Sequence, residues 1–275
     1  MPTDNKTKRA PIVTALHAAH KIGVDGSGVE QPREVPAEMP VAISFLGIGY
    51  AVMMATPNDL EDFAYGFARS ERLIDSAADV IGIEVGAEEK GVLLGIELAP
   101  ARHDRVLARV RHRVGESSCG LCGIENLEQA LRPLPTLPAP AHIAPAAIFR
   151  ALEAIRVHQP LNTATGAVHA AALCDAAGNV LAVREDVGRH NAFDKLVGHC
   201  LRDELDMASG FALLTARCSY ELVEKAALAG IPALVTISAP TSLAVERAEE
   251  AGLTLIALAR PDSMLVMTDP HGLFA

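Results

Sequence analysis

The sequence predicts an α/β protein: a three-layer α/β sandwich with a mixed sheet in the C-terminal half, preceded by a smaller α+β domain. From residue 145 onward, apolar runs of strand length alternate with helical patterns, as in layered α/β domains. Before residue 132, hairpin patterns surround one helix. Four prolines in residues 133–144 separate the two parts, and such a segment favours an extended linker. With 275 residues the chain is long enough for two domains.

The N-terminal segment is expected to contain little regular structure. Residues 1–30 are polar and charged without sustained periodicity, which predicts a flexible arm with at most a short strand near its end. Two strands are then predicted, at residues 41–45 and 50–55, around the turn Gly47-Ile48-Gly49.

A helix is predicted directly after these strands. Thr56 suits the N-cap, Pro57 the first helical position and Asp59 the first turn. The apolar residues that follow recur at i, i+3, i+4 and i+7 and should face the core: Leu60, Phe63, Ala64 and Phe67.

The rest of the N-terminal domain is predicted to be mainly strands. Residues 80–85 and 91–98 should form a hairpin. In residues 105–114, apolar and polar residues alternate well enough to predict a further strand. Together these elements predict a domain over residues 31–132, followed by the proline-rich linker.

The C-terminal half, residues 145–275, alternates between helices and strands. Helices are predicted at 146–157, 189–201, 220–229 and 242–251, and strands at 168–174, 180–183, 211–216, 233–238, 253–258 and 264–268. This order predicts a cytidine deaminase-like fold. Zinc deaminases need a Glu two residues after the helix-opening His and a paired Cys on the next helix. Here His190 has no such Glu, and Cys218 stands alone, so we expect no metal.

Two cysteines three residues apart, Cys119 and Cys122, form the motif CGLCG. A Gly after each Cys permits close approach of the backbone to a partner, and a helix predicted just behind them would favour the thiolate. Zinc binding would usually need a second such pair. Thiol-disulfide exchange remains an alternative. A surface loop with two incidental cysteines is disfavoured, because an exposed thiol pair is an oxidation liability.

Composition excludes several functions. The net charge of −10 argues against a nucleic-acid surface. The longest apolar run, residues 41–55, is too short to span a bilayer, and the N-terminus has no secretory pattern, so no membrane association is expected. Unpaired cysteines in an unsecreted chain favour a reducing compartment, the cytoplasm.

Polar side chains gather at three predicted strand-to-helix turns. A helix N-terminus behind a glycine can bind an anion, and Arg189 and His190 would strengthen such a site. Arg217 and Ser219 repeat the pattern on the next helix. Helix capping explains Ser219 and Thr241 equally well. Because the three turns lie at one sheet edge, they predict a ligand crevice.

Several segments together resemble the FdhD family, formate dehydrogenase accessory sulfur carrier proteins. The resemblance covers the chain from about residue 30 and is carried by four segments: TPNDLEDFAYGFARSERLI, CGLCG, EDVGRHNAFDKLVG and RCSYELVEKAALAGIPALVTISAPTSLAVERAE. It implies a cytoplasmic homodimer that takes persulfide sulfur from a cysteine desulfurase. That sulfur would pass to the molybdenum cofactor, bis-molybdopterin guanine dinucleotide, for formate dehydrogenase.

The same resemblance implies roles for individual residues. Cys119 would carry the persulfide and Cys122 would assist or resolve it. The guanine dinucleotide would contact the segment after the last core strand, Leu258, Ala259, Arg260, Pro261, Asp262 and Ser263. Leu258 stands where the family often has an aromatic residue, and Ser263 where it often has an arginine. Two alternatives remain open: a cofactor chaperone without sulfur transfer, and a CxxC thiol-disulfide oxidoreductase.

Overall fold

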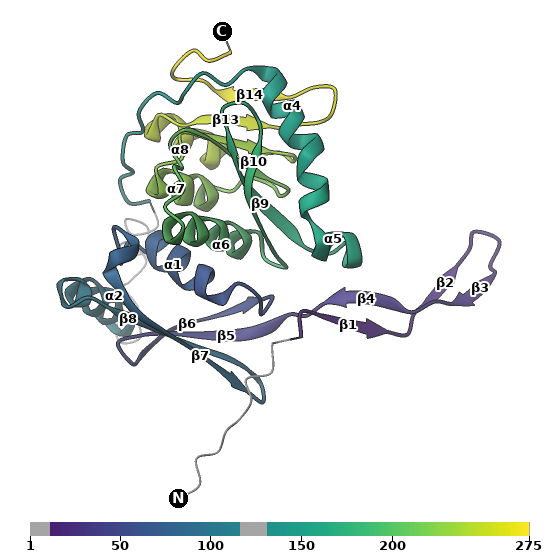
Figure 1. Cartoon of the computed structure of the whole chain (residues 1–275), viewed down its shortest axis with the longest axis horizontal. Coiled ribbons are helices and arrows are strands. Elements are labelled where there is room, and N and C mark those ends of the chain that lie inside the picture. The colour runs from purple at the N-terminus through teal and green to yellow at the C-terminus, as the bar shows by residue number, and fades with distance from the viewer. Residues whose placement is uncertain (1–11, 116–130, 275) are drawn as a thin grey trace, which may run out of the picture.

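The computed structural model describes residues 12–115 and 131–274. It contains a four-stranded sheet in the N-terminal part and a six-stranded sheet in the C-terminal part, with helices packed between them (Figure 1). None of the helices in these described ranges has the length and apolar character that crossing a membrane requires.

The four-stranded sheet has the order β6-β5-β8-β7. Its strands are β5 (Met39–Phe45), β6 (Ile48–Ala55), β7 (Val80–Glu88) and β8 (Gly91–Leu98). Helix α1 (Leu60–Ser70) covers one face, and its predicted apolar stripe is buried there against Phe45 and Tyr50. The predicted hairpins and this helix are therefore confirmed.

Two local predictions for this part are wrong. Residues 105–114 are not a strand: they belong to helix α2 (His103–Gly115). Val106 and Val110, four residues apart, pack on the sheet core, so the helical period outweighs the alternation. The N-cap of α1 is Asp59, with φ 49°, instead of Thr56.

The prediction of a flexible arm is also wrong for residues 12–30, the part of it that the structure describes. Strand β1 (Thr14–His17) pairs with β4 (Arg33–Pro36), and β2 (His20–Ile22) pairs with β3 (Gly28–Glu30). This ribbon projects away from the two sheets (Figure 1). The turn between β2 and β3 contains Asp25-Gly26, and Gly26 has φ 78°, as a tight hairpin requires. Strands this short carry too little periodicity to predict.

The six-stranded sheet has the order β10-β9-β11-β12-β13-β14 and is mixed, as predicted. Its strands are β9 (His169–Asp175), β10 (Val180–Asp186), β11 (Gly210–Leu214), β12 (Ala233–Thr236), β13 (Thr254–Ala257) and β14 (Leu265–Thr268). β11, β12 and β13 run parallel, and the other pairings are antiparallel.

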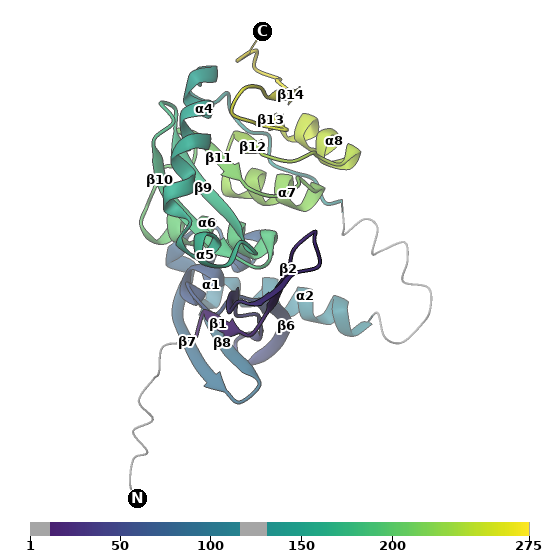
Figure 2. The ribbon, with the colours of Figure 1, turned by 90° about the vertical axis from the view of Figure 1, so that its right-hand side faces the viewer.

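Helices cover both faces of this sheet and give three layers (Figure 2). Helices α6 (Arg189–Arg202), α7 (Tyr220–Ala229) and α8 (Ser242–Ala251) bury their apolar sides on one face. Helix α4 (Pro145–Ala154) covers the other, with Ile148 fully buried against β9 and β11. A short helix, α5 (Pro160–Thr165), was not predicted.

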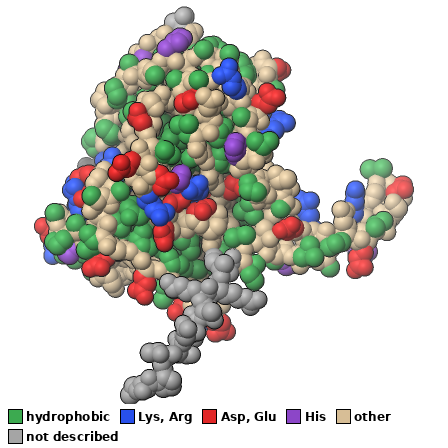
Figure 3. Space-filling view, viewed as in Figure 1, with side chains coloured by type: hydrophobic (Ala, Val, Ile, Leu, Met, Phe, Trp, Pro, Cys, Tyr) green, Lys and Arg blue, Asp and Glu red, His purple; other side chains and the backbone are tan. Residues whose placement is uncertain are grey.

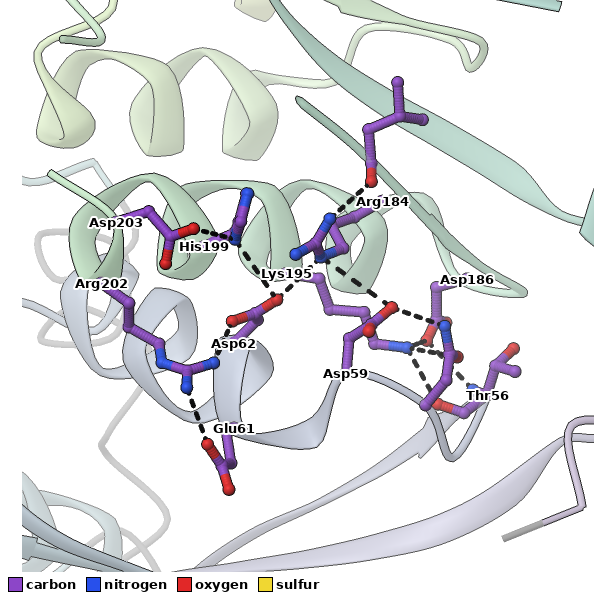
Figure 4. A network of polar contacts seen from close by, with 12 residues as sticks. Thr56, Asp59, Glu61, Asp62, Arg184, Asp186, Lys195, His199, Arg202 and Asp203 are labelled. Atoms are coloured by element: carbon purple, nitrogen blue, oxygen red, sulfur yellow. Dashed lines mark hydrogen bonds and ion pairs between the residues drawn. The ribbon is translucent and has the colours of Figure 1, made fainter. Parts of the chain in front are cut away.

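Helices α1 and α6 join the two parts through direct backbone contact. A Cβ added to Gly66 would lie 1.7 Å from the carbonyl oxygen of Asp194, and one added to Gly198 would lie 1.8 Å from that of Asp62. Arg184 Nε donates to Asp62 at 2.7 Å, and Arg202 also donates to this carboxylate (Figure 4). On the face shown in Figure 3, acidic and basic side chains are interspersed over this junction.

Residues 131–144 contain no regular secondary structure and run along the C-terminal part. The Leu137 amide donates to Ala251 at 2.8 Å, and its side chain is buried among α6, α7 and α8. The division of the chain into domains at residues 31–132, 133–144 and 145–275 stays a prediction.

Candidate functional site

The five cysteines of the chain fall into two groups. Cys119 and Cys122 lie outside the described residues. The other three, Cys174, Cys200 and Cys218, are free and buried at 1% exposure or less. Burial raises the pKa of each of these three thiols to about 12. At neutral pH they are protonated, and a protonated thiol is not a nucleophile.

The predicted polar turns gather at one edge of the six-stranded sheet. Since β10, β11, β12 and β13 all run in the same direction, their carboxyl ends share this edge. Arg189 follows β10, Arg217 follows β11 and Arg260 comes three residues after β13. The edge therefore carries Arg189 and Arg217 from two of the predicted turns, and Arg260 from the segment that the family resemblance indicated.

The arginines differ in their availability. Arg217 is exposed. Arg189 is half-buried, and its Nε is buried without a hydrogen-bond partner among the described residues. Burial, followed by the positive charge of Arg189, lowers the pKa of His169 at the same edge. Arg260 is exposed, but its Nη1 donates to the Ile237 carbonyl at 2.6 Å.

The segment after β13 forms a closed turn. The Arg260 amide donates to the Ser263 carbonyl at 2.7 Å, and Ser263 Oγ donates to Asp262. Leu258 adopts φ 49°, and Ala259 is buried. Because Ala259 is only 2% exposed, the ligand contacts predicted for this segment must come from its neighbours.

His190 faces a different space from its neighbour Arg189. It lines a cavity of about 330 Å³ between α1, α6, α7 and β6. Its Nε2 lies 3.2 Å from Ser219 Oγ and 2.9 Å from Glu221 Oε2. The hydrogen bond from His190 lowers the pKa of the Glu221 carboxyl. The structure thus brings His190 and Ser219 together, and adds Glu221, which the sequence analysis did not select.

The capping interpretation holds for only one of the residues considered. Thr241 is the N-cap of α8, and its Oγ1 accepts from the Ala244 amide at 3.2 Å. Ser219 occupies the N-cap of α7 but makes no side-chain capping bond. Its hydroxyl instead contacts His190 and donates to Glu221 Oε2 at 3.4 Å.

A buried network fixes the start of α6 (Figure 4). Asp186 accepts from the Thr56 and Gly188 amides at 3.0 and 2.7 Å, and Thr56 Oγ1 accepts from the Val187 amide. Thr56, predicted to cap α1, instead ties the chain ahead of α1 to the turn that carries Arg189. Sequence reasoning missed this role, because no local pattern reveals a partner about 130 residues away.

Part of the cavity is lined by charged residues that lie on either side of residues 116–130 in the sequence. Its lining there includes Glu71, Arg109 of α2 and Arg132. Helix α2 leads into residues 116–130, and Arg132 follows them by two residues. The cavity is therefore lined by Arg109 before this stretch and by Arg132 after it, as well as by His190 at the start of α6.

The charges around the cavity are mixed. Asp194 accepts from Lys225 at 2.7 Å and from Ser70 at 2.6 Å, and Glu71 accepts from Arg109 at 3.3 Å. Within residues 12–115 and 131–274, no group of three or more His, Cys, Asp or Glu side chains is placed to hold a metal ion.

Comparison with known proteins gives consistent matches. The model of the FdhD/NarQ family matches residues 36–274. A protein of Xanthomonas euvesicatoria named sulfur carrier protein FdhD is 51% identical over 87% of this chain and 85% of its own length. A protein of Variovorax paradoxus with the same name is 45% identical over 86% of this chain and 85% of its own length.

A solved structure agrees with these relatives. The crystal structure of a Desulfotalea psychrophila protein, assigned as a formate dehydrogenase accessory protein, superposes with a TM-score of 0.70 at 26% identity. The match covers 94% of this chain and 99% of that one, so both sheets and the helices between them are included.

Proposed function

Because the chain belongs to the FdhD/NarQ family, we propose that it is a sulfur carrier that bears the transferred sulfur as a persulfide on Cys119. The relatives named sulfur carrier proteins support the general role. The assignment of the persulfide to Cys119 is part of this proposal and is not contained in the relatives' names.

One observation carries this assignment. Three of the five cysteines are buried, and burial raises the pKa of each to about 12. Since the thiolate is the form that attacks sulfur, Cys174, Cys200 and Cys218 are unsuited to the reaction. Cys119 and Cys122 are then the two candidates in the sequence.

Two transfers with balanced electrons complete the cycle. First, the Cys119 thiolate attacks the terminal sulfur of a donor persulfide; the new S–S bond forms on Cys119 and the donor leaves as a thiolate. Next, Cys122 attacks the Cys119 sulfur, a disulfide forms and sulfide departs to the acceptor. The two cysteines supply the two electrons, and a dithiol reductant then restores both thiols.

The proposal extends to the partners. A cysteine desulfurase would supply the persulfide, and the acceptor substrate would be bis-molybdopterin guanine dinucleotide destined for formate dehydrogenase. The guanine dinucleotide would lie along the edge that carries Arg189, Arg217 and Arg260, with His190 and Ser219 at the adjoining cavity. We further propose that the carrier works in the cytoplasm as a homodimer.

Mass spectrometry of the purified chain tests the carrier role. After incubation with a cysteine desulfurase and cysteine, we expect a mass increase of one sulfur atom that is absent in Cys119→Ala. Cys200→Ala is the matched control and should gain the sulfur as the wild type does. Cys119→Ala should also fail to support formate dehydrogenase activity in a strain that lacks the wild-type chain.

The alternatives give different results in the same experiment. A cofactor chaperone would acquire no sulfur, and Cys119→Ala would retain full activity. A thiol-disulfide oxidoreductase would also acquire no sulfur, and would turn over substrate disulfides through a reversible Cys119–Cys122 bond. A wild type that gains no sulfur would therefore refute the carrier role.

A further inference from the structure

A second pocket adjoins the cavity and is rich in arginine. It has a volume of about 280 Å³ and lies between the end of α1 and helix α2. The charged residues that line it are Arg72, Arg105, Arg109, Arg132 and Glu71. Four cations around one carboxylate are unusual in a chain whose net charge is −10.

Two of these arginines have carboxylate partners. Arg105 donates to both oxygens of Asp75, at 2.8 and 2.9 Å. Arg109 donates to Glu71 Oε2 at 3.3 Å, and the same oxygen accepts from Tyr50 at 2.6 Å. Their positive charges are therefore balanced by close neighbours.

Arg72 and Arg132 differ from that pair. In the part of the chain that the structure describes, no carboxylate forms an ion pair with either one. Glu224 raises the pKa of both, but it is paired with Arg247 at 2.6 Å. Arg72 Nη1 donates to the Pro133 carbonyl at 3.0 Å. Its Nε and Nη2 are buried and have no hydrogen-bond partner among the described residues.

This arrangement is unfavourable in the absence of an anion. Burial, followed by the nearby charge of Arg132, lowers the pKa of Arg72, and burial also lowers that of Arg132. Buried donors without acceptors and neighbouring like charges both destabilise the site. A bound oxyanion would accept the free N–H groups and neutralise both cations at once.

We propose that the pocket between Arg72 and Arg132 binds a phosphate or pyrophosphate group. The planar donor fork of a guanidinium matches phosphate oxygens in two-point contacts. Pockets that hold whole drug-sized ligands begin at about 300 Å³, so this one suits a single anionic group. It is separate from the sheet edge that carries Arg189, Arg217 and Arg260.

The identity of the natural ligand rests on the proposed function, because the acceptor proposed there carries pyrophosphate groups. Arg132 lies two residues beyond the stretch that contains Cys119, and α2 leads into that stretch. A pyrophosphate held by Arg72 and Arg132 would therefore hold the acceptor close to residue 131, where the described chain resumes after that stretch.

Calorimetry with inorganic pyrophosphate tests the site on the full chain. We expect binding to the wild type, and about ten- to a hundredfold weaker binding to Arg72→Ala and to Arg132→Ala, because each loses charge-assisted contacts. Arg111→Ala removes the same charge from an exposed position of α2 outside the pocket and should bind as the wild type does. No binding by the wild type, or an equal loss in Arg111→Ala, would overturn the proposal.

Thermal unfolding gives a second readout. Pyrophosphate should raise the melting temperature of the wild type and of Arg111→Ala, and raise it less in Arg72→Ala and Arg132→Ala. If Arg72→Ala does not fold, Arg132→Ala alone decides, because the described residues provide no ion pair for Arg132 to lose.

Persulfide formation separates this site from the proposed function. Arg72→Ala should accept sulfur from the desulfurase at the wild-type level. If the wild type binds pyrophosphate through Arg72 and Arg132 but gains no sulfur, the anion site stands and the carrier role fails. The reverse result would leave the carrier role and remove the anion site.

Discussion

Lys195 Nζ lies 2.7 Å from Asp186 Oδ2, and both side chains are fully buried (Figure 4). Lys195 also donates to the Thr56 carbonyl at 2.9 Å and to Asn58 Oδ1 at 3.1 Å. Asp186 accepts from the Gly188 amide at the start of α6. The ion pair thereby joins the chain ahead of α1 to the turn that presents Arg189 and His190.

Replacement of this lysine should be costly. Lys195→Met leaves the Asp186 carboxylate buried without its counter-ion, which typically lowers the free energy of unfolding by about 3–5 kcal/mol. Urea unfolding measures the change, with the exposed Lys90→Met as the control. A loss below about 1 kcal/mol in Lys195→Met would mean that the pair contributes little.

The crossing of α1 and α6 should tolerate no side chain at Gly66. In Gly66→Ala the new Cβ would meet the Asp194 carbonyl at 1.7 Å, whereas in Gly86→Ala the nearest atom is 3.8 Å away. We expect Gly66→Ala to lose about 3 kcal/mol or more of unfolding free energy, because the helices must separate, and Gly86→Ala to lose much less. Equal values for the two variants would contradict the close crossing.

Thiol labelling should distinguish the two groups of cysteines. Burial and a pKa of about 12 make Cys174, Cys200 and Cys218 unreactive in the folded chain. At pH 8 the native wild type should take up at most two equivalents of a thiol reagent and the Cys119→Ala/Cys122→Ala variant none. Denatured samples should react at all remaining cysteines. Native labelling of the double variant would show that a buried thiol becomes accessible.

The His190–Glu221 contact predicts a pH dependence of stability. The hydrogen bond from His190 holds the Glu221 pKa below its ordinary value of 4.5, so the ionised carboxylate stabilises the folded state above that pH. The contribution is lost as the pH falls through the folded-state pKa. Because Glu221 is 46% exposed, Glu221→Gln should lose no more than about 1 kcal/mol at pH 7.

The measurement is urea unfolding of both proteins from pH 7 to pH 3. The difference in unfolding free energy should shrink below pH 4.5. A difference that stays constant over this range would assign the effect to packing instead of charge.

The strand-end arginines should govern nucleotide affinity. GDP serves as a probe for the guanine half of the acceptor, and Arg217→Ala should bind it about ten- to a hundredfold more weakly, since a charge-assisted phosphate contact is lost. Arg217 is exposed. Arg156→Ala is the control and should bind GDP as the wild type does, because Arg156 is exposed near α4 on the opposite face of the sheet. Calorimetry that finds equal affinity for wild type, Arg217→Ala and Arg189→Ala would place the nucleotide elsewhere.

Most elements of the fold were predictable from local patterns. The stripe of α1 and the alternation of helices and strands from α4 to β14 predicted the architecture correctly, because burial imposes its period on the sequence. Residues 105–114 were misassigned for the same reason: their valines fit both periods, and contact with the four-stranded sheet selected the helix. The short paired strands β1 to β4 depend on partners up to 22 residues away, which no periodicity reveals.

The candidate site was predictable only in part. Arg189 and Arg217 could be assigned to one edge, because parallel strands end together, and the family resemblance added Arg260. The separation of His190 from Arg189, and its contact with Glu221, follow from the packing of α6 on α7. The roles of Thr56 and Lys195 in positioning α6 come from contacts across 130 and 139 residues.

The sequence by itself determined the family and most of the order of the elements, since both depend on residues close together in the chain. Tertiary structure decided which charges are compensated. Arg72 and Arg132 are 60 residues apart, and nothing in their local sequence distinguishes them from Arg105 and Arg109. Only the folded chain brings the four into one pocket and provides carboxylates for two of them, because ion pairing depends on distance in space.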